Sequence, residues 1–192
     1  TQVIIIGGSL VGLSAAAFLG WRGVKTIVVE RHRGSALHPR ATGFTERTLE
    51  SFRAIGIADQ IPLVDAGFRL RRATAESLVG AIQHEAPWTP SAHAAPVNPD
   101  RVLSPAGMAG FAQDKLEPIL RARAIELGAE LRLGTELLSF EETDGGIKAK
   151  LRDRETGRDY VLSAAYMIAA DGADSQVRQA LAIERVGVGH IM

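Results

Sequence analysis

The sequence predicts an α/β fold that combines a parallel sheet with an antiparallel β-meander. Two apolar segments of strand length, residues 2–6 and 25–29, flank an apolar segment of helix length, residues 10–21. A short strand–helix–strand unit of this kind gives two parallel strands joined by a right-handed crossover. Between residues 130 and 163, short strand-like segments are separated by turn sequences, which is typical of an antiparallel meander.

Composition and charge exclude several classes of function. The chain has 192 residues, 46% of them hydrophobic, and its 22 basic and 22 acidic side chains give a formal net charge of zero. This balance gives no reason to expect nucleic acid or an anionic membrane as a partner. Cysteine is absent and the five histidines lack metal-ligand spacing, so we expect no metal site. No apolar run is long enough to span a bilayer, and a cytoplasmic protein is the default expectation.

The N-terminal elements follow from composition. Residues 3–6 are β-branched and apolar, as in a parallel strand that is buried on both faces. The next segment is rich in small and apolar residues, and Gly20 and Gly23 are placed to end it as a helix. Residues 25–29 are again β-branched and apolar, and this second predicted strand ends on Glu30.

The middle of the chain changes in character. Thr45 is placed to cap a helix that runs to Gly56. In residues 67–100 apolar and arginine side chains alternate from Phe68 onward, which predicts a strand exposed on one face, with a second strand near residues 78–84. Four of the eight prolines follow within this stretch. We interpret residues 67–100 as an excursion out of the first domain.

The C-terminal elements begin with a helix. Asp114 and Glu117 form the pattern of a capping box, and Pro118 would fall in the first turn, where backbone N–H groups lack helical partners. A buried strand, residues 166–170, and a short helix capped by Ser175 come last. The predicted meander lies between these helices and consists of residues 130–133 with 137–142, 147–153 and 160–163.

A glycine-rich turn joins the first strand to the first helix. Its sequence, Gly7-Gly8-Ser9-Leu10-Val11-Gly12, stands where a G-x-G-x-x-G phosphate-binding turn belongs. Gly7 permits the tight turn, position 9 must let the backbone approach a pyrophosphate, and Gly12 lets the helix pack closely on the strand. The helix N-terminus then offers unpaired N–H groups to the phosphates. Ser9 replaces the usual middle glycine, so the turn alone is also compatible with an ordinary α/β protein.

Glu30 strengthens this interpretation. It lies about twenty residues beyond the glycines, at the end of the second strand, where a carboxylate accepts hydrogen bonds from ribose hydroxyls. The same carboxylate repels a 2′-phosphate and disfavours NADP at this position. The turn and Glu30 together predict a Rossmann-like dinucleotide-binding unit.

A family resemblance rests on four segments that occur in order, residues 3–12, 28–32, 39–41 and 169–173. They resemble the N-terminal part of a class A flavoprotein aromatic hydroxylase of the p-hydroxybenzoate hydroxylase fold, in particular hydroxylases that tailor aromatic polyketide antibiotics. The resemblance implies that the dinucleotide is FAD. It also implies a Rossmann-like FAD-binding domain in two segments, residues 1–66 and 101–182, with parts of a substrate-binding β-sheet domain in residues 67–100 and 183–192.

The resemblance also implies further cofactor contacts. Arg40 would contact the ribityl or pyrophosphate portion of FAD, and Arg31 would flank the adenosine. Gln113 matches a glutamine that hydrogen-bonds the flavin side, and Leu137 would lie near the adenine, chiefly through its backbone. Asp171-Gly172 matches a motif that serves FAD and NAD(P)H binding. The predicted cofactor-binding set is Gly7, Gly8, Ser9, Leu10, Val11, Gly12, Glu30, Arg31, Arg40, Gln113, Leu137, Asp171 and Gly172.

The resemblance implies a reaction as well. Enzymes of this family pass a hydride from NADPH or NADH to the flavin, and the reduced flavin reacts with O₂ to form a C4a-hydroperoxide that hydroxylates a small aromatic substrate. Family members are much longer and carry a later Gly-Asp motif. We therefore expect this chain to need the C-terminal half of the protein as a partner, and to lack hydroxylase activity and hold FAD poorly alone. No catalytic residue can be assigned.

Three alternatives stay open. One is another enzyme of the same flavin fold, a halogenase, an epoxidase or a reductase. Another is an NAD-binding dehydrogenase domain, in which further parallel strands would follow the first unit instead of a proline-rich stretch and a meander. The third is a non-catalytic FAD-binding fragment.

Overall fold

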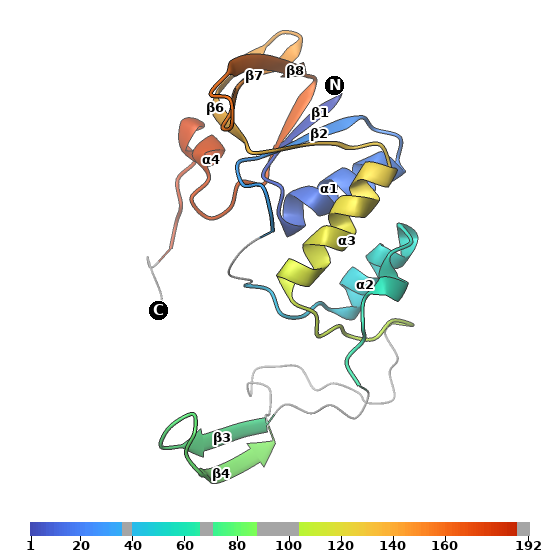
Figure 1. Cartoon of the computed structure of the whole chain (residues 1–192), viewed down its shortest axis with the longest axis vertical. Coiled ribbons are helices and arrows are strands. Elements are labelled where there is room, and N and C mark those ends of the chain that lie inside the picture. The colour runs from blue at the N-terminus through green and yellow to red at the C-terminus, as the bar shows by residue number, and fades with distance from the viewer. Residues whose placement is uncertain (36–39, 66–70, 88–103, 188–192) are drawn as a thin grey trace.

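The computed structural model of the chain describes residues 1–35, 40–65, 71–87 and 104–187 (Figure 1). At its centre is a parallel sheet of four strands in the order β5-β2-β1-β9. The two central strands are buried because their β-branched side chains have packing partners on both faces. The strands are β1 (Val3–Ile6), β2 (Thr26–Glu30), β5 (Glu130–Leu133) and β9 (Tyr166–Ala169).

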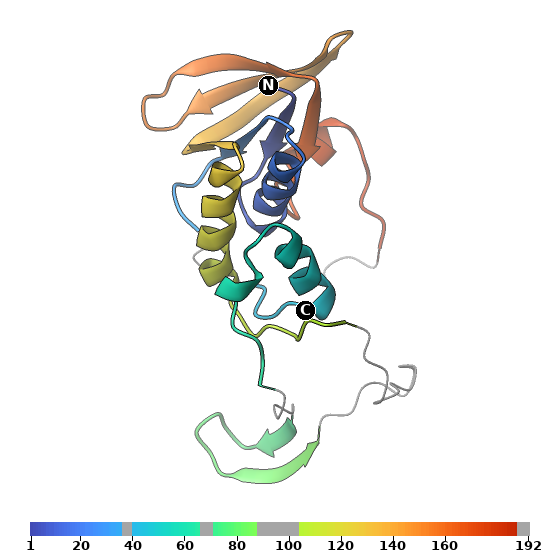
Figure 2. The same cartoon turned by 90° about the vertical axis from the view of Figure 1, so that its right-hand side faces the viewer.

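Two helices cover one face of this sheet, α1 (Leu10–Trp21) and α3 (Gln113–Glu126) (Figure 2). Ile5 and Val28 face them and share one core with Leu13. The helices themselves approach closely, since a Cβ added at position 20 of α1 would lie 2.7 Å from a backbone oxygen at the end of α3.

An antiparallel meander covers the opposite face of the sheet (Figures 1 and 2). Ile4 and Ile6 alternate with the residues that face the helices, and they pack against Leu151 of the meander. The molecule therefore has three layers, helices, parallel sheet and meander. The meander strands are β6 (Thr135–Thr143), β7 (Gly146–Asp153) and β8 (Asp159–Ala164), and the short helix α4 (Gln176–Ala180) lies beside them.

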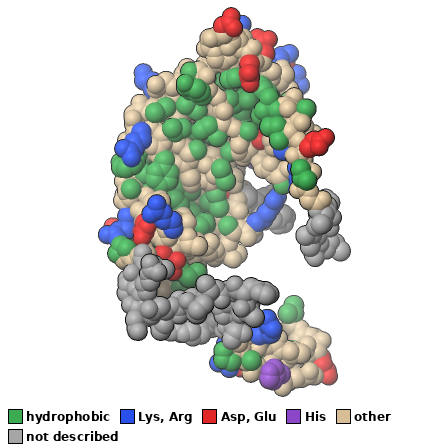
Figure 3. Space-filling view, turned by 180° about the vertical axis from the view of Figure 1, so that it is seen from behind, with side chains coloured by type: hydrophobic (Ala, Val, Ile, Leu, Met, Phe, Trp, Pro, Cys, Tyr) green, Lys and Arg blue, Asp and Glu red, His purple; other side chains and the backbone are tan. Residues whose placement is uncertain are grey.

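The remaining elements lie toward the other end of the molecule. Helix α2 (Glu46–Ala54) and the 3₁₀ turn η1 (Ala58–Gln60) extend the helical core. Strands β3 (Arg71–Ala75) and β4 (Ile82–Pro87) form an antiparallel hairpin that stands apart from the three layers (Figure 1). Figure 3 shows hydrophobic side chains gathered over the rear of the body, with charged side chains mainly at its margins.

The first strand–helix–strand unit is confirmed, but one strand of the predicted meander is misplaced. Residues 130–133 form β5, which pairs with β2 at the edge of the parallel sheet. Gly134, at φ +69°, separates β5 from β6 and redirects the chain into the meander. The second strand of the hairpin is also shifted, because residues 77–80 form a turn and β4 begins only at Ile82. The predicted start of the first hairpin strand at Phe68 lies outside the described residues.

Two predicted helix caps differ from the structure, whereas the third is confirmed. Thr45 occupies the N-cap of α2, but its hydroxyl lies 3.4 Å from that of Thr48 and caps no backbone amide. The capping box at Asp114 is wrong because α3 already begins at Gln113, which places Pro118 beyond the first turn. Ser175 does cap α4, since its hydroxyl accepts a hydrogen bond from the backbone N–H of Arg178 at 3.0 Å.

Within the described ranges, none of the helices has the length and apolar character that a membrane crossing requires. The same ranges contain no cluster of three or more acidic or histidine side chains that could hold a metal ion.

Candidate cofactor-binding site

The carboxyl ends of three parallel strands meet at one edge of the sheet. Gly7 follows β1, Glu30 ends β2, and Asp171 comes just after β9. Ligands of open α/β sheets bind beyond the carboxyl ends of the strands. The fold therefore gathers the glycine turn, the acidic strand end and the Asp-Gly motif at the edge where a ligand is expected.

The glycine turn is tightly confined. Gly7 has φ +104°, and a Cβ added there would lie 2.3 Å from the carbonyl oxygen of Ala170, so the turn touches the segment that carries the Asp-Gly motif. A Cβ at Gly8 would lie 2.7 Å from the Cβ of Glu30. Neither position has room for a side chain, which explains why both residues are glycine.

The start of α1 offers free donors. Within the described part of the chain, the backbone N–H groups of Leu10, Val11 and Gly12 have no acceptor, as the first turn of a helix requires. These donors, together with the helix dipole, form an anion-binding position. The side chain of the N-cap residue Ser9 accepts no hydrogen bond from these backbone N–H groups. The groups therefore stay available to an anion.

Glu30 is held by hydrogen bonds to both of its carboxylate oxygens. The backbone N–H of Gly8 donates to Oε2 at 2.7 Å, and the backbone N–H of His32 donates to Oε1 at 2.8 Å. The ring Nδ1 of His32 lies 2.8 Å from the same Oε1. The side chain of Glu30 is 12% exposed, so this oriented carboxylate still has a face toward solvent.

Gln113 links the glycine turn to the loop that carries Arg40. Its side-chain nitrogen donates to the hydroxyl of Ser9 and to Oε1 of Glu117, both at 2.9 Å. Its side-chain oxygen accepts from the backbone N–H of Arg40 at 3.2 Å, and its own backbone N–H donates to the carbonyl of Ala41 at 2.9 Å. Gln113 therefore lies close to the turn, but most of its hydrogen-bonding capacity is used within the protein.

Asp171 has one carboxylate oxygen without a partner. Its Oδ2 accepts a hydrogen bond from the backbone N–H of Val177 at 3.2 Å, whereas its buried Oδ1 has no donor among the described residues. A buried acceptor without a donor costs about 1–3 kcal/mol. A hydroxyl or amide of a ligand would remove this cost. Gly172 follows at φ +88°, where glycine is favoured.

The other predicted residues differ in their exposure. Arg40 is exposed, and Arg31 lines a depression of about 320 Å³ next to the end of β2, together with Arg33, Gly134 and Arg154. Leu137 is only 8% exposed and packs in the core beneath the meander.

Sequence analysis missed two residues of the site. Glu117 was interpreted as part of a capping box, and His32 was given no role, although both hold predicted site residues in place. Glu117 is four residues after Gln113 and so shares a helix face with it. That spacing is the signal that could have identified Glu117.

The fold is that of an α/β dinucleotide-binding domain, with a strand–turn–helix unit and an acidic residue at the end of its second strand. The family described as FAD binding domain matches residues 1–192, and the chain belongs to this family. The prediction of a flavin-binding domain is thereby confirmed, and the alternative of an NAD-binding dehydrogenase domain is not supported.

Relatives of the chain include hydroxylases and monooxygenases, among them a putative polyketide hydroxylase. It is 38% identical to aklavinone 12-hydroxylase DnrF of Streptomyces peucetius and 35% identical to tetracenomycin A2 monooxygenase-dioxygenase of Streptomyces glaucescens, in each case over 98% of this chain. A solved ternary complex of aklavinone-11 hydroxylase with FAD and aklavinone matches 97% of the chain with a TM-score of 0.76 and 38% identity. The chain spans 39%, 36% and 36% of the lengths of these three proteins.

Proposed function

We propose that this chain is the FAD-binding part of a monooxygenase that hydroxylates a small aromatic, polyketide-type substrate with NAD(P)H and O₂. The observation that carries the proposal is the convergence of the phosphate turn, Glu30 and the unpartnered Oδ1 of Asp171 at one sheet edge. The names of the relatives support the substrate class and the reaction type. Because the chain spans well under half of each relative, substrate, NAD(P)H and O₂ are proposed for the whole protein.

The residues present fit FAD. The turn from Gly7 to Gly12 supplies free amides for the pyrophosphate, and its glycines leave no side chain in the way. Glu30 would accept hydrogen bonds from the ribose hydroxyls of the adenosine. Asp171 would accept a hydrogen bond from the ligand at its unpartnered Oδ1. FAD supplies hydride acceptance and O₂ activation, and this chain's own residues bind and orient it.

We assign the remaining predicted residues to supporting contacts. Arg31 would flank the adenosine, while the exposed Arg40 would donate to the pyrophosphate or ribityl portion. Gln113 would accept from the flavin side through its side-chain oxygen, and Leu137 would contact the adenine through its backbone. Gly172 would approach FAD with its backbone.

We further propose that residues 67–100 and 183–192 contribute to a substrate-binding sheet. Strands β3 and β4 support this, because almost all of their residues are exposed in the described structure. The backbone edges of this hairpin can pair with further strands. The C-terminal part of the longer protein is the partner proposed for these segments. A cytoplasmic location stays a prediction.

The proposal is tested by titrating the whole protein that contains this chain with FAD and, separately, with NAD⁺. We expect FAD fluorescence to be quenched on binding and NAD⁺ to bind much more weakly. Arg40→Ala should weaken FAD binding, while Arg47→Ala, which changes an exposed arginine on α2, should leave it unchanged. A whole protein that takes up NAD⁺ but no FAD would overturn the proposal. Substrate-dependent NAD(P)H oxidation, measured on the whole protein with aromatic polyketides, tests the reaction.

A further inference from the structure

Glu117 is a buried carboxyl group that the proposed chemistry does not use. It lies on α3 with 1% of its surface exposed, among apolar side chains such as Leu116 and Leu120. Burying such a group is costly unless hydrogen bonds satisfy it. Its Oε1 accepts from the hydroxyl of Ser9 at 2.5 Å and from the side-chain nitrogen of Gln113 at 2.9 Å. A buried, satisfied polar group of this kind fixes the geometry of whatever it holds.

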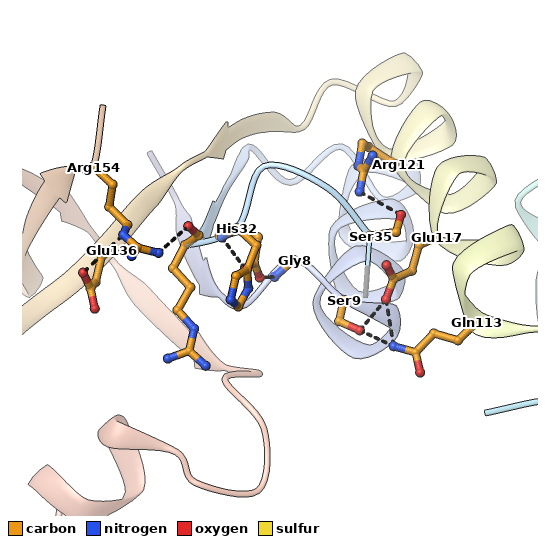
Figure 4. A network of polar contacts seen from close by, with 11 residues as sticks. Gly8, Ser9, His32, Ser35, Gln113, Glu117, Arg121, Glu136 and Arg154 are labelled. Carbon is orange, nitrogen blue, oxygen red and sulfur yellow. Dashed lines mark hydrogen bonds and ion pairs between the residues drawn. The ribbon is translucent and has the colours of Figure 1, made fainter. Parts of the chain in front are cut away.

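The three side chains form a closed ring of hydrogen bonds (Figure 4). Ser9 donates to Glu117 and accepts from Gln113, so its hydroxyl proton is directed to α3 and away from the phosphate position. Ser9 is therefore more than a small residue that the turn tolerates in place of glycine. Its side chain attaches the turn to α3.

The ring reaches a second loop through Gln113. Because the Gln113 nitrogen is held by Ser9 and Glu117, its oxygen is oriented toward the backbone N–H of Arg40. One buried carboxyl group thus sets the positions of two segments, the phosphate turn and the Arg40 loop. These segments come from parts of the chain about thirty residues apart, and no direct hydrogen bond between the two is found among the described residues.

We propose that Glu117 is a positioning residue that holds the phosphate turn and the Arg40 loop in the arrangement that FAD binding requires, with Ser9 as its contact on the turn. This inference rests on the proposed function, because FAD is the ligand that both segments would contact. Pre-organised contacts raise affinity by lowering the ordering cost of binding.

The sharpest test is Ser9→Gly, which restores the usual glycine pattern of the turn. Motif reasoning alone expects no loss of affinity from this change. The ring predicts a loss, so we expect the dissociation constant for FAD to rise about tenfold, in line with a lost hydrogen bond to a charged group. In a chain that already carries Glu117→Leu, the same change should have no further effect, because the ring is already broken.

Variants of Glu117 separate positioning from packing. Glu117→Leu should raise the FAD dissociation constant about tenfold, and Glu117→Gln should recover most of the affinity because its amide oxygen can still accept both hydrogen bonds. Glu126→Leu and Glu126→Gln on the same helix are matched controls, since the Glu126 side chain is 63% exposed. If Glu117→Leu does not fold, the inference is tested with the other two variants. Ser9→Gly should then raise the FAD dissociation constant about tenfold, whereas Glu117→Gln should keep most of the affinity.

A second measurement uses the chain without flavin. Amide hydrogen exchange at Arg40 should be faster in Glu117→Leu and in Gln113→Leu than in the unchanged chain, and should be unchanged in Glu126→Leu. If the whole protein does not bind FAD, the proposed function fails while this exchange result still tests the ring. The inference is overturned if Glu117→Leu folds and alters neither FAD affinity nor exchange at Arg40, or if the effects of Ser9→Gly and Glu117→Leu on affinity are additive.

Discussion

A Cβ atom on residue 12 would lie 1.8 Å from the carbonyl oxygen of Gly7. The first turn of α1 therefore rests directly on the backbone at the end of β1. No rotamer change can relieve this contact, because the Cβ position is fixed by the backbone and the opposing atom is a main-chain oxygen. The distance explains in physical terms why the last glycine of the turn is required.

We expect Gly12→Ala to destabilise the chain by about 3 kcal/mol, at the upper end of overpacking changes, because α1 must move away from the sheet. Urea unfolding followed by circular dichroism measures this loss. Gly145→Ala is the control, since nothing lies within 4 Å of the added Cβ, and it should change stability by less than about 0.5 kcal/mol. Equal stabilities of the two variants would contradict the prediction.

Glu30→Ala should weaken FAD binding about tenfold or more, because the N–H of Gly8 loses its acceptor and the ribose hydroxyls lose theirs. Glu30→Gln should bind FAD better than Glu30→Ala, since one oxygen remains. Fluorescence titration gives both constants, with Glu142→Ala on the exposed part of the meander as the control. Retained affinity in Glu30→Ala would remove this residue from the site.

Asp171→Asn tests the unpartnered oxygen. The amide oxygen can still accept from Val177, so the unfolding free energy should change by less than about 0.5 kcal/mol. The affinity for FAD should nevertheless fall about tenfold if a donor of the ligand uses the charged oxygen. A variant that lost stability but bound FAD normally would assign Asp171 to the fold alone.

Ser175→Ala should destabilise the chain by about 1 kcal/mol through loss of the N-cap of α4. Ser175→Asp should restore most of this loss, because aspartate also caps helices well. Thermal and urea unfolding measure the effect, and Ser163→Ala, at an exposed position on β8, is the matched control. If alanine and aspartate behave alike at position 175, the cap contributes nothing.

The hydrogen bonds from Arg152 hold the pKa of Asp159 below its ordinary value of 3.8, and Lys150 acts in the same direction. A lowered pKa means that the stabilisation is present above pH 3.8 and is lost as the pH falls through the pKa of the folded state. Urea midpoints should therefore fall less steeply below about pH 4 in Asp159→Asn than in the unchanged chain. Asp144→Asn, in the exposed turn before β7, should keep the original slope.

The sequence by itself determined the first strand–helix–strand unit, the turn that joins its parts and the cap of α4. These features depend on residues close together in the chain: a β-branched run, an apolar helix between glycines, and a serine placed at a helix start. Local steric and hydrogen-bonding preferences are enough to fix such elements, and Glu30 could be placed because it is the last residue of its strand.

The tertiary structure alone decided where β5 pairs and which way Glu117 points. Residues 130–133 resemble any short strand, and only hydrogen bonds to β2, about a hundred residues earlier, place them in the parallel sheet. Glu117 fits the sequence pattern of a capping box. In the structure, packing of α3 on α1 turns its side chain inward, where it contacts Ser9. The physical reason is that strand pairing and burial depend on segments distant in sequence, which local propensity does not encode.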